Sequence, residues 1–297
     1  MDKSANNQIL GALEAGGTKM VCAIGAPDGT ILDQISIPTE KPEITMPKMI
    51  DYFRSKNISA LGIGSFGPID LNRNSATYGY ITTTPKPGWG NYDICGEFGK
   101  ALNVPIGFDT DVNAAALGEA VYGAAKGLDS AIYITIGTGI GVGVLSEGKL
   151  LHGMLHPEAG HILIGKLKGD TFEGKCPFHK TCFEGMASGP AIEARWGQKG
   201  DKLAATDEVW ELEAEYIAHA LVNYTMTLSP KRIILGGGVM NQLQLFPLIR
   251  RRFGELLNGY IKTAELSDSD SFIVPAGLGG TQGIVGCLVL AAGAINE

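Results

Sequence analysis

The sequence predicts an α/β fold of two lobes with a central cleft, and three observations lead to this expectation. A hairpin of two apolar strands joined by a Gly turn opens the chain at residues 9–25, and a second such hairpin begins at residue 130. Each hairpin is followed by a similar succession of strands and helices, which is typical of a duplicated fold. The length of 297 residues is enough to bury the cores of two medium-sized lobes.

The elements of the first half can be assigned in order. Residues 9–25 predict two strands around the turn in EAGGTK, and the turn PDGT leads to a third strand of an antiparallel meander. Residues 46–56 have helical spacing, with Met46 and Met49 on one side. ALGIGSF and VPIGFDTD predict strands on either side of an irregular stretch at 71–95, and the Ala-rich run DVNAAALGEAVYGAA predicts a helix.

The second half repeats this order. Residues 130–151 predict another Gly-turn hairpin with a short third strand, and a long helix is expected at about 207–228. KRIILGGGV and SFIVPA predict strands, with a helix in QLFPLIRRRFGELL between them. We therefore expect a small lobe at residues 1–118 and a large lobe at 119–279. The C-terminal helix, at about 280–297, is expected to pack back on the small lobe.

Composition excludes several classes of function. The net charge is −7 with no basic block, which argues against a nucleic-acid partner. No apolar run approaches the ~20 residues of a membrane span, and the start MDKSANNQIL lacks the apolar stretch of a signal peptide. The five cysteines are odd in number and mostly scattered, so a disulfide framework is not expected. These features predict a cytoplasmic protein without a membrane partner.

Three glycine loops follow apolar strands. They are EAGGTK at Glu14–Lys19, GTGIGVG at Gly137–Gly143 and LGGGV at Leu235–Val239. Glycine lets backbone N–H groups approach a ligand closely, and successive N–H groups form concavities that suit phosphate oxygens. Any one loop could be only a tight hairpin, but three of them favour a nucleotide. Neither a Walker A nor a Rossmann pattern is present. Two hairpin phosphate loops resemble the actin/hexokinase-like, ribonuclease H-like ATPase fold.

A strand end rich in carboxylates suggests the chemistry. In DTDVNAAALGE, Asp109 or Asp111 could simply cap the following helix. Alternatively, Asp111 accepts a proton from a substrate hydroxyl during phosphoryl transfer, which needs one such carboxylate beside positioning and charge neutralisation. Downstream, HPEAGHI and CFEG offer Glu158, His161 and Glu184. Carboxylates and an imidazole in one cleft suit a polyol, because sugars are held by paired hydrogen bonds.

Six motifs together resemble the ROK family of repressors, unannotated reading frames and sugar kinases. In chain order they are EAGGTK, GFDTDVNAAALGE, IGTGIGVG, HPEAGH, CFEGMASGPAI and LGGGV, and they span most of the sequence. Within the family the sequence is most similar to bacterial fructokinases. The resemblance implies a kinase that makes sugar 6-phosphates from ATP with Mg²⁺, usually as a homodimer.

The resemblance also assigns expected roles, motif by motif. Asp111 matches the catalytic base. Substrate positions are expected at Glu158, His161 and Glu184, at Thr110, and at Gly67 and Pro68 in the SFGPID loop. Cofactor positions are expected in the three glycine loops, at Glu14, Gly16, Gly17, Thr18, Lys19, Gly137, Thr138, Gly139, Gly236, Gly237 and Gly238. Two residues depart from the common pattern: Glu14 replaces an Asp, and Thr110 replaces the Asn of glucokinases, which disfavours glucose as the preferred sugar.

The stretch KCPFHKTCFEG predicts a structural zinc site. Cys176, His179 and Cys182 supply three ligands at equal spacing, and four-coordinate zinc needs a fourth. ROK proteins resemble this arrangement, in which the His of E-x-G-H, here His161, joins a downstream Cys cluster. The nearby His152 and His156 remain possible fourth ligands, and a surface loop with two free thiols is the simpler alternative. A zinc ion would pin His161 and, three residues earlier, Glu158.

Other functions compete with a fructokinase. A sugar-responsive repressor would need an N-terminal helix-turn-helix, for which the residues before Ile9 leave no room. A non-catalytic sugar-binding module would not need three glycine loops together with Asp111. Glucokinase, mannokinase and N-acetylhexosamine kinase remain open, because the loops around SFGPID and TTTPKPGWGNYDI shape the pocket. Thr82, Trp89 and Asp93 there are either sugar neighbours or ordinary loop residues.

Overall fold

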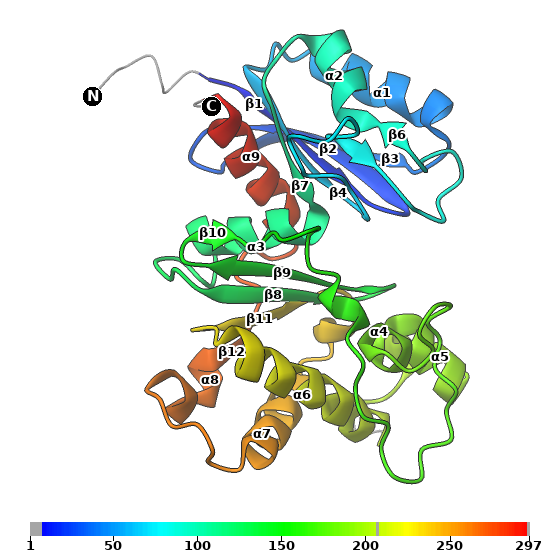
Figure 1. Cartoon of the computed structure of the whole chain (residues 1–297), viewed down its shortest axis with the longest axis vertical. Coiled ribbons are helices and arrows are strands. Elements are labelled where there is room, and N and C mark those ends of the chain that lie inside the picture. The colour runs from blue at the N-terminus through cyan, green and yellow to red at the C-terminus, as the bar shows by residue number, and fades with distance from the viewer. Residues whose placement is uncertain (1–7, 206–207, 296–297) are drawn as a thin grey trace. The chain divides into compact units, whose positions relative to one another are not determined.

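The computed structural model describes residues 8–205 and 208–295. Its chain divides into two compact units. Unit 1 comprises residues up to 126, residues 150–157 and residues from 277 onward, and unit 2 comprises 127–149 and 158–276. Each unit contains one five-stranded sheet with helices, which confirms the expected α/β class (Figure 1). Residues 1–7, 206–207 and 296–297, which belong to the predicted lobes and helices, lie outside the described residues.

The sheet of unit 1 has the strand order β3-β2-β1-β4-β7. β1 pairs antiparallel with β2 and β2 with β3, which is the expected meander, whereas β4 and β7 extend the sheet in parallel. The central strands β1 and β4 are almost wholly buried, as expected for strands covered on both faces. The strands are β1 (Leu10–Ala15), β2 (Lys19–Gly25), β3 (Ile31–Pro38), β4 (Ala60–Ser65) and β7 (Ile106–Thr110).

Helices cover both faces of this sheet. Leu13 of β1 packs with the helices α1 and α2, whereas Leu10 and Ala12 pack with α3 and α9. Because alternate residues of a strand point to opposite faces, these two clusters lie on opposite sides of the sheet. The helices are α1 (Pro42–Arg54), α2 (Ile94–Leu102), α3 (Asp111–Val121) and α9 (Gln282–Ala294), and a two-stranded ribbon is made by β5 (Tyr80–Ile81) and β6 (Tyr92–Asp93).

The small residues of α9 let this helix approach its neighbours closely. A Cβ atom at Gly286 would overlap the carbonyl group of Ala114 in α3. On the sheet side, a Cβ at Gly62 would overlap the carbonyl group of Cys287. The glycines therefore set the distance between α9, α3 and the sheet. They place α9 within unit 1, although it follows the whole of unit 2 in the sequence.

The sheet of unit 2 repeats the topology of the first, with the order β10-β9-β8-β11-β12. β8 pairs antiparallel with β9, and β11 is parallel to both β8 and β12. The correspondence of the two strand orders confirms the duplication expected from the two Gly-turn hairpins. The strands are β8 (Ala131–Ile136), β9 (Ile140–Ser146), β10 (Lys149–Leu150), β11 (Ile233–Gly236) and β12 (Ile273–Pro275).

The longest helix of the described chain, α6, packs against α7 and α4 in unit 2. α6 buries Tyr216, Ile217, Leu221 and Tyr224 along one side. The helices are α4 (Phe183–Ala187), α5 (Gly189–Trp196), α6 (Val209–Leu228), α7 (Leu245–Leu257) and α8 (Ser269–Phe272). Short 3₁₀ turns are η2 (Ala159–His161), η3 (Gly200–Lys202), η4 (Val239–Asn241) and η5 (Glu265–Ser267).

The division between the units differs from the predicted boundary at residue 118. The buried carboxylate of Glu119, near the end of α3, accepts hydrogen bonds from the backbone N–H groups of Ala124, Gly277 and Leu278 at 2.6, 3.0 and 3.2 Å. These bonds hold both chain segments in unit 1. Local sequence patterns do not reveal these contacts, because the bonds to Gly277 and Leu278 join residues more than 150 positions apart.

Residues 150–157, which were predicted in the large lobe, also belong to unit 1. Nε2 of His152 lies 2.8 Å from Oδ2 of Asp109, and Nε2 of His156 accepts the backbone N–H of Ile69 at 3.1 Å. Residues 150–157, called the strap below, are therefore held by one histidine contact to β7 and one to the loop after β4. The strap ends at Pro157, one residue before the predicted sugar ligand Glu158.

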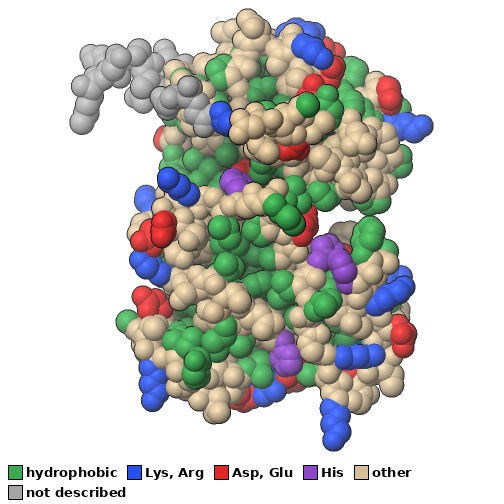
Figure 2. All heavy atoms as spheres, in the orientation of Figure 1, with side chains coloured by type: hydrophobic (Ala, Val, Ile, Leu, Met, Phe, Trp, Pro, Cys, Tyr) green, Lys and Arg blue, Asp and Glu red, His purple; other side chains and the backbone are tan. Residues whose placement is uncertain are grey.

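The surface carries mixed charge. On the face that Figure 2 draws, Lys and Arg side chains are interspersed with Asp and Glu side chains in both units. Among the helices of the described residues, none has the length and apolar character needed to cross a membrane. Charge distribution therefore does not mark a binding surface on this face.

Candidate active site and metal centre

The first glycine loop forms the turn between β1 and β2. The N–H of Gly16 donates to the carbonyl of Lys19 at 3.0 Å, and the hydroxyl of Thr39 donates to the carbonyl of Gly16 at 2.7 Å. Thr18 and Lys19 are exposed at the tip. Burial raises the pKa of the Glu14 carboxyl, and the charge of Lys19 offsets part of this shift. A desolvated carboxyl at the foot of an exposed, donor-rich turn is suited to bind a cation.

The second and third glycine loops meet in unit 2. The N–H of Gly189 donates to the carbonyl of Gly137 at 2.8 Å, which attaches the start of α5 to the second loop. A Cβ atom at Gly137 would lie 3.6 Å from the backbone nitrogen of Gly238 in the third loop. Gly237 has a φ of +88°, and a Cβ there would meet the backbone of Ile136. Glycine is therefore required at the point where the two loops touch.

A pocket of about 480 Å³ opens beside these two loops. Its volume falls in the usual range for small-molecule sites, and its lining mixes apolar groups with a few charged ones. Trp210 and Ile192 supply apolar surface, and Glu193, Lys199 and Asp201 supply charge. The other lining residues are Gly137, Thr138, Gly189, Pro190, Gly200, Gly238, Val239 and Gln242. Of the predicted cofactor positions, Gly137, Thr138 and Gly238 line this pocket.

Asp111 begins α3 but does not cap it. The N-cap is Thr110, whose Oγ1 accepts the N–H of Asn113 at 3.1 Å. Oδ1 of Asp111 accepts the N–H of Val112 at 2.9 Å. The alternative in which Asp111 serves only as the helix cap therefore does not hold. Asp111 lies in the first turn, where the helix dipole favours a negative charge.

The buried carboxylate of Asp109 supports this helix start. Its Oδ1 accepts hydrogen bonds from the N–H of Thr110 at 2.8 Å and from Nδ2 of Asn113 at 2.7 Å. Its Oδ2 lies 2.8 Å from Nε2 of His152, and this hydrogen bond raises the pKa of the His152 imidazole. Sequence patterns did not reveal the partner, because His152 is 43 positions away. These hydrogen bonds of Asp109 fix the backbone at the start of α3, where Asp111 lies.

The loop that contains Gly67 and Pro68 is joined to two other segments of unit 1. Both the N–H and the hydroxyl of Thr82 donate to the carbonyl of Pro68, at 2.8 and 3.0 Å. On the other side, His156 receives the N–H of Ile69, and burial lowers the pKa of its imidazole, consistent with a neutral acceptor nitrogen. The predicted loop thus lies between the strap 150–157 and the segment that follows β5.

Two possible sugar neighbours serve the fold instead. Trp89 is fully buried in the core, and its Nε1 donates to the carbonyl of Glu40 at 2.8 Å. Asp93 caps α2, because its Oδ1 accepts the N–H of Gly96 at 2.7 Å. Both residues therefore have structural partners that account for them. Thr82, in contrast, contacts the predicted Gly67–Pro68 loop through its two hydrogen bonds to Pro68.

Glu158, His161 and Glu184 all belong to unit 2. Oε2 of Glu184 accepts the N–H of Ile140 at 3.0 Å, which ties this carboxylate to the second glycine loop. Burial, and then the charge of Glu184, raises the pKa of the Glu158 carboxyl. The N–H of His161 donates to the carbonyl of Glu158 at 3.0 Å within η2. The structure thus brings the acidic pair together with His161.

Four side chains of unit 2 form a group that could hold a metal ion. The ligand atoms of His161, Cys176, His179 and Cys182 all lie within 4.8 Å of one another. Nδ1 of His161 lies 3.7 Å from Sγ of Cys176 and 3.5 Å from Sγ of Cys182. A tetrahedral zinc ion with bonds of about 2.0–2.3 Å separates its ligands by about 3.3–3.8 Å. The donor set and the two distances from His161 therefore fit zinc.

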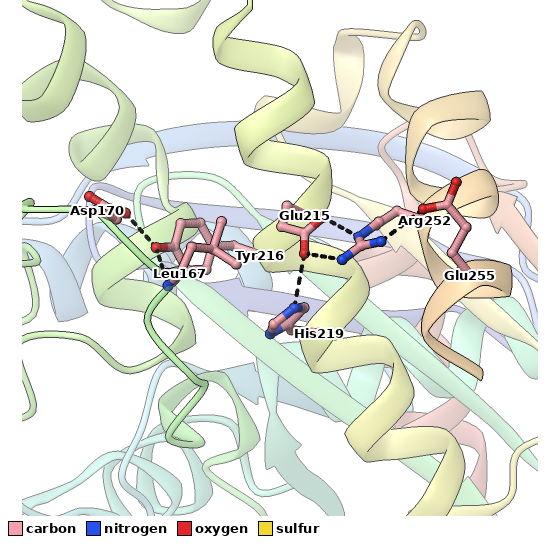
Figure 3. Close-up of polar contacts among 7 residues, drawn as sticks. All are labelled: Leu167, Asp170, Glu215, Tyr216, His219, Arg252 and Glu255. Carbon is pink, nitrogen blue, oxygen red and sulfur yellow. Dashed lines mark hydrogen bonds and ion pairs between the residues drawn. The ribbon is translucent and has the colours of Figure 1, made fainter. Parts of the chain in front are cut away.

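The other candidate histidines are engaged elsewhere. His152 pairs with Asp109 and His156 with the N–H of Ile69, so neither is part of the metal-binding group. Nε2 of His219 lies 3.1 Å from Oε1 of Glu215 one turn earlier in α6 (Figure 3). Of the three candidates for a fourth ligand, His161 is the one that lies in this group.

α6 contacts the segment that carries the metal group at two points. The hydroxyl of Tyr224 donates to the carbonyl of Ala159 at 2.6 Å. Further along, Tyr216 donates to the carboxylate of Asp170 and receives the N–H of Leu167 at 3.3 Å (Figure 3). Hydrogen bonds from α6 therefore hold the metal-binding segment, although this segment contains little regular structure of its own.

Comparisons with known proteins agree along the whole chain. The ROK family model matches residues 10–294. The sequence is 50% identical over 289 residues to a fructokinase of Pediococcus pentosaceus, covering 97% of this chain and 99% of that protein. It is 42% identical over 290 residues to a fructokinase of Streptococcus mutans, covering 96% and 98%. Among solved structures, a ROK hexokinase from Thermus thermophilus matches with a TM-score of 0.79 at 25% identity, over 97% of this chain and 99% of that one.

Proposed function

The chain belongs to the ROK family, and from that premise we propose that it is a fructokinase, which transfers the γ-phosphoryl group of ATP to D-fructose and makes fructose 6-phosphate. One observation carries the proposal. Two fructokinases, at 50% and 42% identity, align with this chain over almost their full lengths. The glycine loops and Asp111 supply the groups that phosphoryl transfer requires.

Asp111 is the proposed general base. Because Thr110 caps α3, the carboxylate of Asp111 is not needed for that purpose. It would accept the proton of the sugar hydroxyl as the oxygen of that hydroxyl attacks phosphorus. Asp109, Asn113 and His152 hold the start of the helix in place, which keeps the base in position while proton transfer occurs.

Mg²⁺ accompanies ATP in this proposal. Glu14 fits a role near this ion, because its oxygen donors suit Mg²⁺ and its partial burial makes a neighbouring cation favourable. The bound ion would supply charge neutralisation for the phosphate groups. The pocket beside Gly137, Thr138 and Gly238 is the proposed site of the nucleoside, and its volume of about 480 Å³ supports this placement.

A structural zinc ion is proposed at His161, Cys176, His179 and Cys182. Four protein ligands close the coordination shell, so the ion would stabilise structure and would not activate water. Its role would be to fix η2, which contains His161 and directly follows Glu158, beside the proposed sugar. A homodimer and a cytoplasmic location complete the proposal. The first follows from the family resemblance, and the second is consistent with five free cysteines.

A coupled assay of ADP release tests the substrate. Fructose, glucose, mannose and N-acetylated hexosamines are compared at equal concentration, and we expect fructose to react fastest with mannose second. One buried polar group left without its partner changes binding by about 1–3 kcal/mol, or roughly one to two powers of ten in kcat/KM. A rate on glucose tenfold above the rate on fructose would reject fructose as the preferred substrate but would keep the assignment as a hexose kinase. Sugar binding without turnover of any hexose would favour a binding module.

A further inference from the structure

Lys86 places its ammonium group against the first glycine loop, 69 positions away in the sequence. A Cβ atom at Gly17 would lie 3.0 Å from Nζ of Lys86 and 2.7 Å from its Cε. The missing side chain of Gly17 therefore provides the space that the lysine occupies. Both residues belong to unit 1. A cation thus lies directly on the turn that is proposed to bind phosphate.

This ammonium has no internal counter-ion. Within residues 8–205 and 208–295, no carboxylate forms an ion pair with the Lys86 ammonium, whereas the backbone N–H of Lys86 donates to Oγ1 of Thr84 at 3.3 Å. Lys19, on the same turn, differs because its charge acts on Glu14. Lys86 is half-buried, and no carboxylate of the described residues balances its charge beside this turn rich in N–H donors. A phosphoryl group carries the negative charge that would balance it.

The loop that carries Lys86 is held at its base. Trp89 is buried beneath it, and the N–H of Trp89 donates to the carbonyl of Lys86 at 3.1 Å. The N–H of Asn91 closes the loop on the carbonyl of Thr82 at 2.9 Å. Prolines at 85 and 87 restrict the backbone on both sides of the lysine. These constraints reduce the entropy lost when the ammonium is held beside the turn.

The same loop also contacts the proposed sugar-binding region. Thr82 donates two hydrogen bonds to the carbonyl of Pro68. One segment therefore bridges the Gly67–Pro68 loop and the first glycine loop. The position of the Lys86 ammonium therefore depends on both loops. Such a position suits a group that acts between the phosphoryl group and the sugar.

We propose that Lys86 is a catalytic residue that binds the phosphoryl group during its transfer. The inference rests on the proposed kinase function. The sugar O6 forms a bond to the γ-phosphorus, the bond from that phosphorus to the ADP oxygen breaks, and the O6 proton passes to Asp111. Lys86 stays protonated and transfers nothing. Its charge offsets the negative charge on the equatorial oxygens of the transferred group.

The test uses Lys86→Met, which keeps the length of the chain and removes the charge, and Lys86→Arg, which restores a charge. Lys100→Met is the matched control, because Lys100 is an exposed lysine of the same unit that is paired with Glu97. The steady-state kcat and both KM values are measured on full-length enzyme. Inhibition by ADP with aluminium fluoride in the presence of fructose reports affinity for a transition-state mimic. Circular dichroism and metal content verify the fold.

We expect Lys86→Met to lower kcat by about 10²-fold or more, the usual effect of removing one donor to developing charge. Its fructose KM should stay within threefold, its fluoride-complex affinity should fall in parallel with kcat/KM, and Lys86→Arg should recover at least tenfold. A kcat within threefold of wild type, or an effect confined to the ATP KM, would overturn the role of Lys86. A wild-type enzyme inactive on every hexose would overturn the proposed function and this inference with it.

Discussion

Nε2 of His152 lies 2.8 Å from the buried Oδ2 of Asp109, two residues before Asp111. The contact fastens the strap 150–157 to the strand end that carries the proposed base. The hydrogen bond to Asp109 raises the pKa of His152, since the charged imidazole is the better partner of a carboxylate. The strap and the start of α3 are therefore coupled through an ionisable histidine.

This coupling predicts a stability that depends on pH. Because the folded-state pKa of His152 is raised, its contribution is complete below the unfolded value of about 6.5 and is lost as pH rises through the folded value. Urea unfolding of wild type and His152→Gln should therefore differ most near pH 5.5 and least near pH 8.5. The difference should stay within about 1 kcal/mol, because the side chain is 40% exposed. Parallel stability curves at all pH values would contradict this account.

Thr110 offers a second test, because its hydroxyl caps α3. Thr110→Ala should lower the free energy of unfolding by about 1 kcal/mol, and Thr110→Ser should largely retain it. Thr110→Asn is the informative variant, since Asn is also a good N-cap and is the residue expected in glucokinases. We expect it to keep stability while lowering the ratio of kcat/KM for fructose over glucose. An unchanged ratio in a stable Thr110→Asn protein would remove Thr110 from sugar discrimination.

The metal group predicts a link between zinc and sugar affinity. Protein purified without added metal should contain about one zinc per chain by elemental analysis. Cys176→Ser and Cys182→Ser should lose the metal and raise the KM for the sugar more than the KM for ATP, because His161 joins the metal group to Glu158. Cys95→Ser, outside the group, is the control that should keep zinc. Loss of zinc with an unchanged sugar KM would break the proposed link.

Local patterns predicted the framework well. The two Gly-turn hairpins indicated the duplicated topology, because alternating strands and turn glycines are encoded within a few residues of one another. The metal ligands Cys176, His179 and Cys182 were likewise visible as a short, regular spacing. α2 was missed because it is short and follows a Gly- and Pro-rich stretch, although Asp93 supplies a cap and Ile94 and Phe98 share one face.

The remaining site features depend on contacts between distant residues. Asp109 and His152, and likewise Gly17 and Lys86, come together only when the sheet and its connecting loops are folded. Side-chain type alone did not distinguish Trp89 as a core residue from a sugar neighbour, since its indole could serve either role. Its burial in the core decides the question.

The most direct test of the account is the rate of Asp111→Ala and Asp111→Asn with saturating ATP and fructose. If Asp111 is the general base, kcat should fall by at least ~10²-fold, while calorimetric affinities for ATP and fructose stay within threefold. Asp129→Ala, which removes an exposed carboxylate paired with Lys231, controls for a general effect of lost charge and should turn over like wild type. Turnover by Asp111→Ala within a few-fold of wild type would contradict the assignment of Asp111 as the catalytic base.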